Sequence, residues 1–151
     1  MKYLKILLTF FCIILHNYCF SKNNYVSQND SIKDKSLDEQ IEYFASDSIV
    51  YDLEKNIIML YNEAKVNYKS IKLQAYYITI NLNDNTLFAE GKLDSSLVLT
   101  QNPIFFENGK EYKSKTIKYN FKTEKGLITK LLTKEGESFL HGEIVKKEKN
   151  K

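Results

Sequence analysis

The feature of this chain that most restricts its fold is a two-residue period of apolar side chains. Ala64, Val66 and Tyr68, for example, alternate with lysine and asparagine. Successive side chains of a β-strand point to opposite faces, so the pattern is typical of strands with one buried and one solvated face. No window after Ala45 has the 3.6-residue period of a helix. The same alternation recurs at Ile71, Leu73 and Ala75, at Ile78, Ile80 and Leu82, and at Ile117, Tyr119 and Phe121.

The apolar phase moves from odd to even positions between Ala75 and Ile78. The pairing register of two strands cannot absorb such a shift without a bulge or a sharp bend. We therefore expect a kink near Tyr76 and Tyr77.

Short polar turns separate the apolar runs and supply Asn, Asp or Gly for positive φ angles. Three segments of eight residues share one pattern. The first position is a small residue and the fourth is Ile. The sixth is an aromatic residue or Ile, the seventh is Asn or Asp, and the eighth is Leu or Phe, after which a turn follows. The segments are residues 46–53, 75–82 and 114–121. A repeated hairpin that cannot close its own apolar face must stack on its neighbours. The pattern predicts one antiparallel all-β domain in this chain of 151 residues.

Residues 1–21 have the form of a secretory signal peptide. Lys2 and Lys5 precede an apolar run over residues 6–15, and the small Ser21 follows. The run is shorter than the roughly 20 residues of a membrane-spanning helix. Cleavage after Ser21 would remove both cysteines, and a lipid anchor at Cys19 is the alternative. A buried N-terminal helix is a further alternative, but the rest of the chain offers no helical pattern to pack against it.

The charge of the exported chain excludes some partners. Removal of residues 1–21 takes away two of the 22 lysines and no acidic residue, so the formal net charge falls from +3 to +1. Nucleic-acid binding favours a clustered basic face, usually with arginine, and this chain has no arginine. We expect no nucleic-acid partner. Along the chain we expect a flexible polar leader over 22–44 with a helical turn at 37–42, a β domain over 45–145, and a Lys-rich tail over 146–151.

Candidate catalytic or metal-binding residues are few. His141, beside Glu135, Glu137 and Glu143, fits a Glu-x-Glu-x-x-x-His metal pattern. A strand-end histidine next to a polar turn is the favoured interpretation, because a metal site needs several ligands and this one would have a single histidine. No cysteine nucleophile would remain after export, and the chain has no Gly-rich phosphate loop. We expect a protein that is not an enzyme, with no metal and no cofactor.

Five segments carry a resemblance to a known family: residues 47–52, 60–66, 88–91, 118–128 and 135–143, of which 119–128 is the most specific. Together they resemble the OstA-like, or LptA-like, domain of lipopolysaccharide-transport proteins. The resemblance covers residues 45–145 and is greatest to the N-terminal periplasmic domain of the outer-membrane LPS-assembly protein of Bacteroidetes-type bacteria. The barrel of that protein does not follow before Lys151, so a free-standing protein and a fragment of a split gene are both left open.

The resemblance implies a folded-over antiparallel sheet, a jellyroll open along one side, with an apolar trough for acyl chains. It implies a periplasmic module that relays lipopolysaccharide to the outer-membrane assembly machinery, with other OstA-like domains joined at its sheet edges. The family usually has Gly at the position of Asn62, and Asn tolerates the left-handed conformation. The apolar positions of the alternating runs are the candidates for the trough: Ile49, Tyr51, Leu53, Val66, Tyr68, Ile71, Leu73, Ile78, Ile80, Leu82, Ile117, Tyr119 and Phe121.

A dry core would use the same apolar residues. The second hypothesis is therefore a structural module that pairs with other chains through its sheet edges. We expect these edges near residues 48–53 and 138–145. The lysines of the tail would repel an identical tail, which favours head-to-tail over symmetric contacts.

Overall fold

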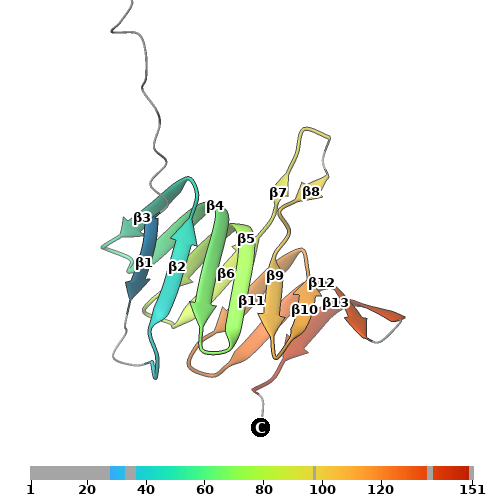
Figure 1. Cartoon of the computed structure of the whole chain (residues 1–151). Coiled ribbons are helices and arrows are strands. Elements are labelled where there is room, and N and C mark those ends of the chain that lie inside the picture. The colour runs from blue at the N-terminus through green and yellow to red at the C-terminus, as the bar shows by residue number, and fades with distance from the viewer. Residues whose placement is uncertain (1–27, 33–36, 97, 136–137, 150–151) are drawn as a thin grey trace, which may run out of the picture.

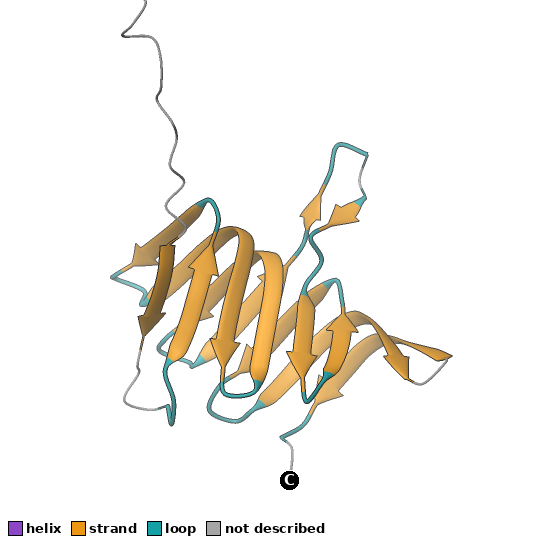
Figure 2. Cartoon of the chain, viewed as in Figure 1, coloured by secondary structure: helices purple, strands orange, loops and turns teal. Residues whose placement is uncertain are grey.

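The computed structural model describes residues 28–32, 37–96, 98–135 and 138–149. These residues form antiparallel strands and contain no helix (Figures 1 and 2), which confirms the predicted all-β class. The strands are β1 (Gln28–Ile32), β2 (Ile41–Ala45), β3 (Ser48–Asp52), β4 (Ile57–Tyr68), β5 (Ile71–Asn81), β6 (Thr86–Glu90), β7 (Lys92–Leu93), β8 (Leu99–Thr100), β9 (Ile104–Glu107), β10 (Lys110–Lys113), β11 (Thr116–Asn120), β12 (Lys125–Glu135) and β13 (Ser138–Lys147).

The main sheet is folded over on itself into two layers (Figure 1). Its three long strands β4, β5 and β12 run from one layer into the other, so each has different neighbours in its two halves. The first half of β4 pairs with β3 and the second with β2, while β5 pairs with β9 and then β6, and β12 with β11 and then β10. As a result, β5, β6, β11, β12, β10 and β9 form a closed, barrel-like ring of pairings.

The long strands bend where the chain departs from regular pairing. The register of β4 against β5 shifts between Tyr61 and Ala64, which lie opposite Tyr77 and Ala75. The irregularity expected at the change of apolar phase is thus confirmed, but the additional residue belongs to β4. Asn62 has a φ angle of 61°, the left-handed conformation that an asparagine tolerates.

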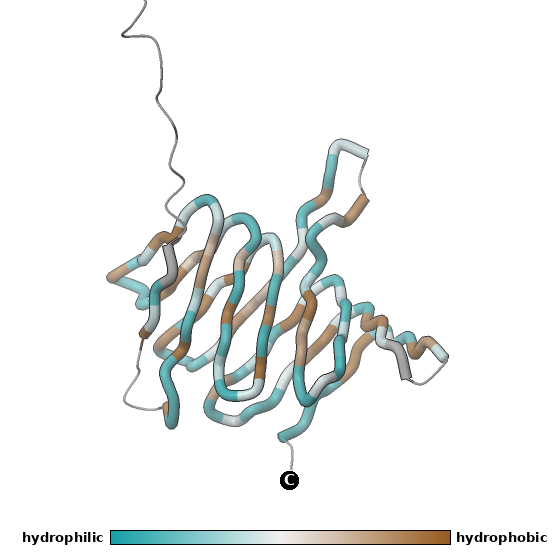
Figure 3. Tube along the Cα trace, viewed as in Figure 1, coloured by the Kyte–Doolittle hydropathy of each residue, from teal (hydrophilic) through white to brown (hydrophobic). Residues whose placement is uncertain are grey.

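The core lies between the two layers. Along β4 and β5 buried residues alternate with exposed ones, as the sequence predicted, and Figure 3 shows the same alternation in hydropathy. Leu60, Ile78 and Ile80 have no exposed surface, whereas Lys65 and Lys72 lie on the solvated face. The alternating apolar residues therefore provide the hydrophobic contacts that hold the layers together.

The three predicted repeats are hairpins with one common turn. Each turn ends in a residue with positive φ: Asn56 at 53°, Asn85 at 54° and Glu124 at 56°. The Asn or Asp that the repeats share caps the turn through its side chain. Asn120 Oδ1, for instance, accepts a hydrogen bond of 2.8 Å from the backbone N–H of Thr123. Asp52 and Asn81 occupy the same position in their own turns.

The three turns stack side by side. The N–H of Leu82 donates to the carbonyl oxygen of Asn56 at 3.0 Å, and the N–H of Phe121 donates to that of Asn85 at 2.9 Å. The Asn120 amide adds a hydrogen bond of 3.0 Å to the carbonyl oxygen of Asp84. The stacking expected of a repeated hairpin is therefore present.

Replacing Asn120 with alanine is expected to lower the free energy of unfolding by about 1–2 kcal/mol, because the turn loses its cap and a hydrogen bond to the next turn. Urea unfolding followed by circular dichroism measures this loss. Asn67→Ala is the control, since Asn67 is exposed in β4 and its side chain makes one long hydrogen bond of 3.5 Å. Equal urea midpoints for the two variants would contradict the prediction.

The structure corrects the expected polar leader where it describes residues 22–44. Residues 28–32 form β1 and residues 41–45 form β2, and the predicted helical turn is absent. Leu37 and Ile41 are buried and anchor the segment. The short alternation at 41–45 was overlooked because the aromatic Phe44 occupies its polar phase. Residues 1–21 lie outside the described residues.

The structure also changes the start of the predicted Lys-rich tail. Strand β13 continues through residues 146 and 147, so the β domain is longer at this end than the sequence indicated. Two lysines of the predicted tail form ion pairs with the body of the protein, Lys147 with Glu107 and Lys149 with Glu124.

Candidate functional site

The space between the two layers, here called the interior, contains most of the predicted trough residues. Ile49 and Leu82 are partly buried and pack against its core. The others at this site are buried: Val66, Tyr68, Ile71, Leu73, Ile78, Ile80, Ile117, Tyr119 and Phe121.

Two of the candidates do not join the interior. Tyr51 is 45% exposed and Leu53 is 74% exposed. Tyr51 belongs to β3, which pairs only with β4, at an end of the sheet. Leu53 lies in the turn after β3, at the equivalent of the buried Phe121 in the third repeat. The repeat pattern overestimated the burial of its first copy because that copy lies at an end of the sheet.

The C-terminal end of the interior holds a cavity of about 270 Å³ that the sequence analysis missed. Its apolar lining comes from β9, β10, β12 and β13: Phe105, Tyr112, Ile128, Leu131 and Val145. Charged residues complete the lining: Glu107, Lys146, Lys147 and Glu148.

A sequence signal for part of this lining exists. The apolar positions Ile128 and Leu131 are three residues apart, the same change of phase that marks the bend in β5. Between them Lys130 has a φ angle of 49°, and there β12 passes from its pairing with β11 to its pairing with β10. Phe105 has no such signal, because its run 104–106 is apolar throughout.

Charged side chains connect the layers along the lower side of the fold. Lys69 Nζ, from the turn between β4 and β5, lies 2.9 Å from Glu124 Oε1, in the turn between β11 and β12. Lys147 Nζ, at the end of β13, lies 3.2 Å from Glu107 Oε1, at the end of β9. We call these four residues the mouth of the interior.

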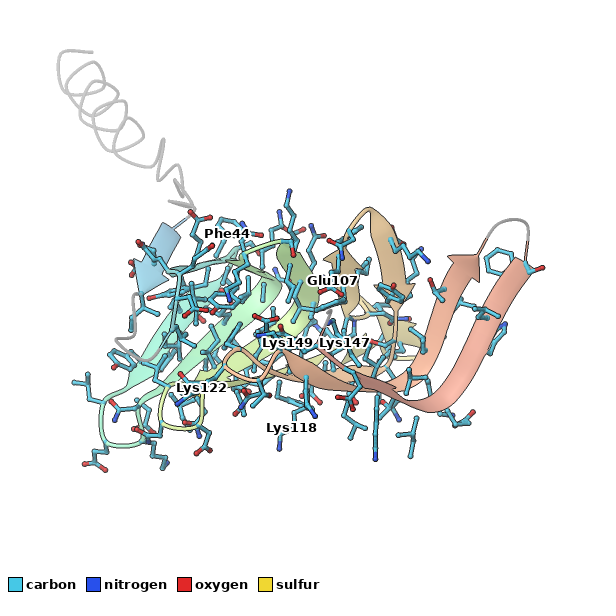
Figure 4. The ribbon with its side chains drawn as sticks, turned by 90° about the horizontal axis from the view of Figure 1, so that it is seen from below. Phe44, Glu107, Lys118, Lys122, Lys147 and Lys149 are labelled. Carbon is cyan, nitrogen blue, oxygen red and sulfur yellow. The ribbon has the colours of Figure 1, made fainter. Side chains whose placement is uncertain are left out.

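The mouth carries further charges. Figure 4 views the molecule from this lower side, where Glu107, Lys147 and Lys149 lie close together. Asp38 Oδ2 is 2.9 Å from Lys69 Nζ, and Lys149 Nζ is 3.7 Å from Glu124 Oε1. The lysines at the mouth therefore have carboxylate partners.

Aromatic rings meet between the layers beside the ion pairs. Tyr68 is the residue before Lys69, and its ring lies 5.1 Å from that of Phe121 in an edge-to-face arrangement. The ring of Phe105 lies 6.0 Å from that of Tyr119. Lys147 Nζ is 6.0 Å from the centre of the Tyr119 ring. An apolar layer thus lies directly beneath the charges of the mouth.

The hydroxyl group of Tyr119 is exceptional in this layer. The residue is 2% exposed, and its hydroxyl has no hydrogen-bond partner among the described residues. Burial raises the pKa of Tyr119, and the negative charges of Glu124 and Glu107 raise it further. The group is therefore a neutral donor without a partner, close to both acidic residues of the mouth.

The ion pair at Lys69 is fully charged at neutral pH. The hydrogen bond from Lys69 lowers the pKa of Glu124. Hydrogen bonds to Asp38 and Glu124 raise the pKa of Lys69. Because the pKa of Glu124 is lower in the folded protein than the value of about 4.3 in an unfolded chain, its carboxylate stabilises the fold at every pH above that value. The stabilisation is lost only when the pH falls through the lower pKa of the folded protein. Mild acid leaves this pair intact.

No group of three His, Cys, Asp or Glu side chains in the described parts of the chain is arranged as metal ligands would be. His141 is exposed on β13, and the side chains of Glu135 and Glu137, its proposed neighbours, lie outside the described residues. The residues that the structure describes also include no helix able to cross a membrane.

Neither a family model nor a curated protein matches the sequence. Proposals about function therefore rest on the residues, on the folded-over sheet, and on the interior with its mouth.

Proposed function

We propose that this protein is an OstA-like transport module. It holds acyl chains of lipopolysaccharide in the interior and passes them toward the outer membrane without chemical change. The observation that carries the proposal is an apolar interior between two sheet layers, with a cavity of about 270 Å³ at its C-terminal end, where Glu107 and Lys147 of the mouth form part of the lining. The resemblance of residues 45–145 to OstA-like domains supports the same function.

The energetics of the interior suit reversible transport. Each methylene group moved from water into an apolar space gains about 0.8 kcal/mol, so partial burial of one acyl chain gives useful affinity. The interior beyond the cavity is filled by protein side chains such as Ile78 and Ile80. A longer chain must therefore part the layers, and on the mouth side they are joined by ion pairs and ring contacts. This cost keeps the affinity moderate and the ligand releasable.

Photo-crosslinking tests the proposed function. A photoreactive residue at Leu73 or Ile80 is expected to capture lipid A, because both side chains point into the interior. The same group at Lys65 or Lys72 is the control, since these positions alternate with the buried ones along β4 and β5. Labelling only at the lysine positions would rule out an interior site.

The proposed partners are other OstA-like domains and the assembly machinery of the outer membrane. One end of the folded sheet presents β1 and β3, and the other end presents β13, which pairs only with β12. A strand with one free edge offers backbone groups to a strand of another chain. The proposed location is the periplasm, reached through export by residues 1–21.

Replacing Ile144 with proline is expected to weaken head-to-tail association at least tenfold while the monomer stays folded. Ile144 is 70% exposed on β13, and proline is tolerated in an edge strand but cannot donate a backbone hydrogen bond. Sedimentation velocity over a concentration series measures the association. A wild-type chain that stays monomeric at high concentration, and binds no other OstA-like domain, would contradict the prediction.

The complete burial of residues such as Leu60, Ile78 and Ile80 favours a second candidate function, a structural module with a dry core. A fluorescent acyl probe distinguishes the two. It gains fluorescence on entering a lipid-binding interior and stays dark beside a dry core.

A further inference from the structure

Two lysines hold positive charge at the rim of the apolar interior. Lys69 and Lys147 come from different layers, and each pairs with an acidic residue of the opposite layer, Glu124 and Glu107. The rings of Tyr68 and Tyr119 lie beneath them. A cation directly above an apolar space fits a molecule with an anionic head group and a hydrocarbon tail.

The pair of Lys147 and Glu107 is largely removed from water, with side chains 13% and 12% exposed. Such a pair has a high desolvation cost that the attraction between its charges roughly offsets. Removing one partner leaves a buried charge without compensation, whereas exchanging one anion for another keeps the compensation. Glu107 is the last residue of β9 and precedes the turn at Asn108 and Gly109.

The Tyr119 hydroxyl is a second, independent sign of a ligand. Nearly all buried polar groups in proteins have a hydrogen-bond partner, and a buried hydroxyl without one is costly. This hydroxyl lies beneath the ion pairs and has no partner among the described residues. A ligand oxygen at the mouth would accept its hydrogen bond.

We propose that Lys69, Lys147 and the hydroxyl of Tyr119 form a head-group site for an anionic amphiphile, whose carboxylate or phosphate displaces Glu124 and Glu107. The acyl chain of the same molecule enters the interior below. This inference rests on the proposed function, because it needs an acyl chain in the interior. It adds a preference for negatively charged head groups and assigns that preference to named residues.

The chemistry of the three donors supports this class of ligand. A lysine ammonium group offers three rotatable donors and accepts carboxylate and phosphate alike, whereas a fixed arginine fork would favour a planar partner. Hydrogen bonds between an ammonium group and an anion are about twice as strong as neutral ones. A neutral amphiphile cannot replace the carboxylates of Glu107 and Glu124, so opening the mouth costs it more.

Two probes with the same chain separate the head group from the tail. Dodecanoate and dodecanol are titrated against the full chain, with displacement of a fluorescent acyl probe as the readout. The wild-type protein is expected to bind dodecanoate at least tenfold more tightly than dodecanol. Added salt should reduce this difference, because it screens the attraction between lysine and carboxylate.

Variants assign the preference to the mouth. Glu107→Gln removes the internal competitor and is expected to tighten dodecanoate binding several-fold while leaving dodecanol binding unchanged. The double variant Lys147→Met with Glu107→Gln removes both charges and leaves no buried ion unpaired. It is expected to lose most of the preference for dodecanoate and to keep only the part that Lys69 and the Tyr119 hydroxyl provide.

Tyr119→Phe keeps the ring and removes only the hydroxyl. It is expected to weaken dodecanoate binding about threefold and dodecanol binding by less, because the charged carboxylate is the stronger hydrogen-bond acceptor. Tyr76→Phe is the matched control, since Tyr76 is only partly buried, and the cation it contacts is Lys92, outside the mouth. Circular dichroism checks that every variant keeps its strands.

The outcomes separate the two proposals. Equal binding of the two probes by the wild type, unchanged in Glu107→Gln, would overturn the head-group site and leave the acyl-binding interior standing. Failure of both probes to bind would overturn the proposed function and the head-group site together. Displacement of dodecanoate by inorganic phosphate at equal concentration would mean that the site takes free anions, which would also overturn the assignment to an amphiphile.

Discussion

Replacing Phe121 with alanine is expected to lower the free energy of unfolding by about 3–5 kcal/mol, the usual loss for a buried phenylalanine. Phe121 is 2% exposed, and its ring contacts those of Tyr68 and Tyr119 at 5.1 and 5.7 Å. The substitution would leave a cavity beneath the mouth and remove a contact between the two layers. Thermal and urea unfolding measure the loss.

Phe139→Ala is the matched control for this prediction. Phe139 is 63% exposed on β13, so its truncation removes little buried surface and should change the free energy of unfolding by less than about 0.5 kcal/mol. Equal losses in the two variants would mean that the ring of Phe121 does not hold the layers together.

Replacing Asn62 with valine is expected to lower the free energy of unfolding by about 1–2 kcal/mol. Asn62 has a φ angle of 61°, and a β-branched residue is strained in this left-handed region. Its side chain also accepts a hydrogen bond of 3.2 Å from the Gln101 amide, which valine cannot replace. The bend that carries β4 from one layer to the other would become less stable.

Asn67→Val makes the same chemical change five residues further along β4, where the backbone is extended. Valine favours extended backbone, so this control should be neutral or slightly stabilising. Urea midpoints of the two variants give the comparison. If Asn67→Val destabilises as much as Asn62→Val, the strain at the bend is not the cause.

The central strands were predictable because their apolar residues face one shared core. Tyr68, Ile80 and Phe121 all lie in alternating runs and are all buried. Strand β1 was not predictable, since Asn29, Asp30 and Ser31 contribute no apolar residue. It pairs with β2 through its backbone, and backbone pairing leaves no mark on side-chain periodicity.

More of the residues of the interior than of its mouth could be predicted from the sequence. The alternation identified residues such as Val66 and Ile117. Ile128 and Leu131 were not identified, because the bend at Lys130 interrupts the two-residue period between them. Lys69 and Glu124 are 55 residues apart, and each looks like an ordinary polar turn residue. Only the folding of the sheet brings them together, so no local pattern could indicate their pairing.

Each of the stacked hairpins adds a fixed length to the folded sheet. Neighbouring strands of a sheet lie about 4.8 Å apart, so one added hairpin of the same kind would lengthen the fold by about 10 Å. Because Asp52, Asn81 and Asn120 close equivalent turns, such a hairpin would leave the width between the layers unchanged. Added hairpins would thus change only the length of the folded sheet. The distance between its layers is set separately, by the bends in β4, β5 and β12.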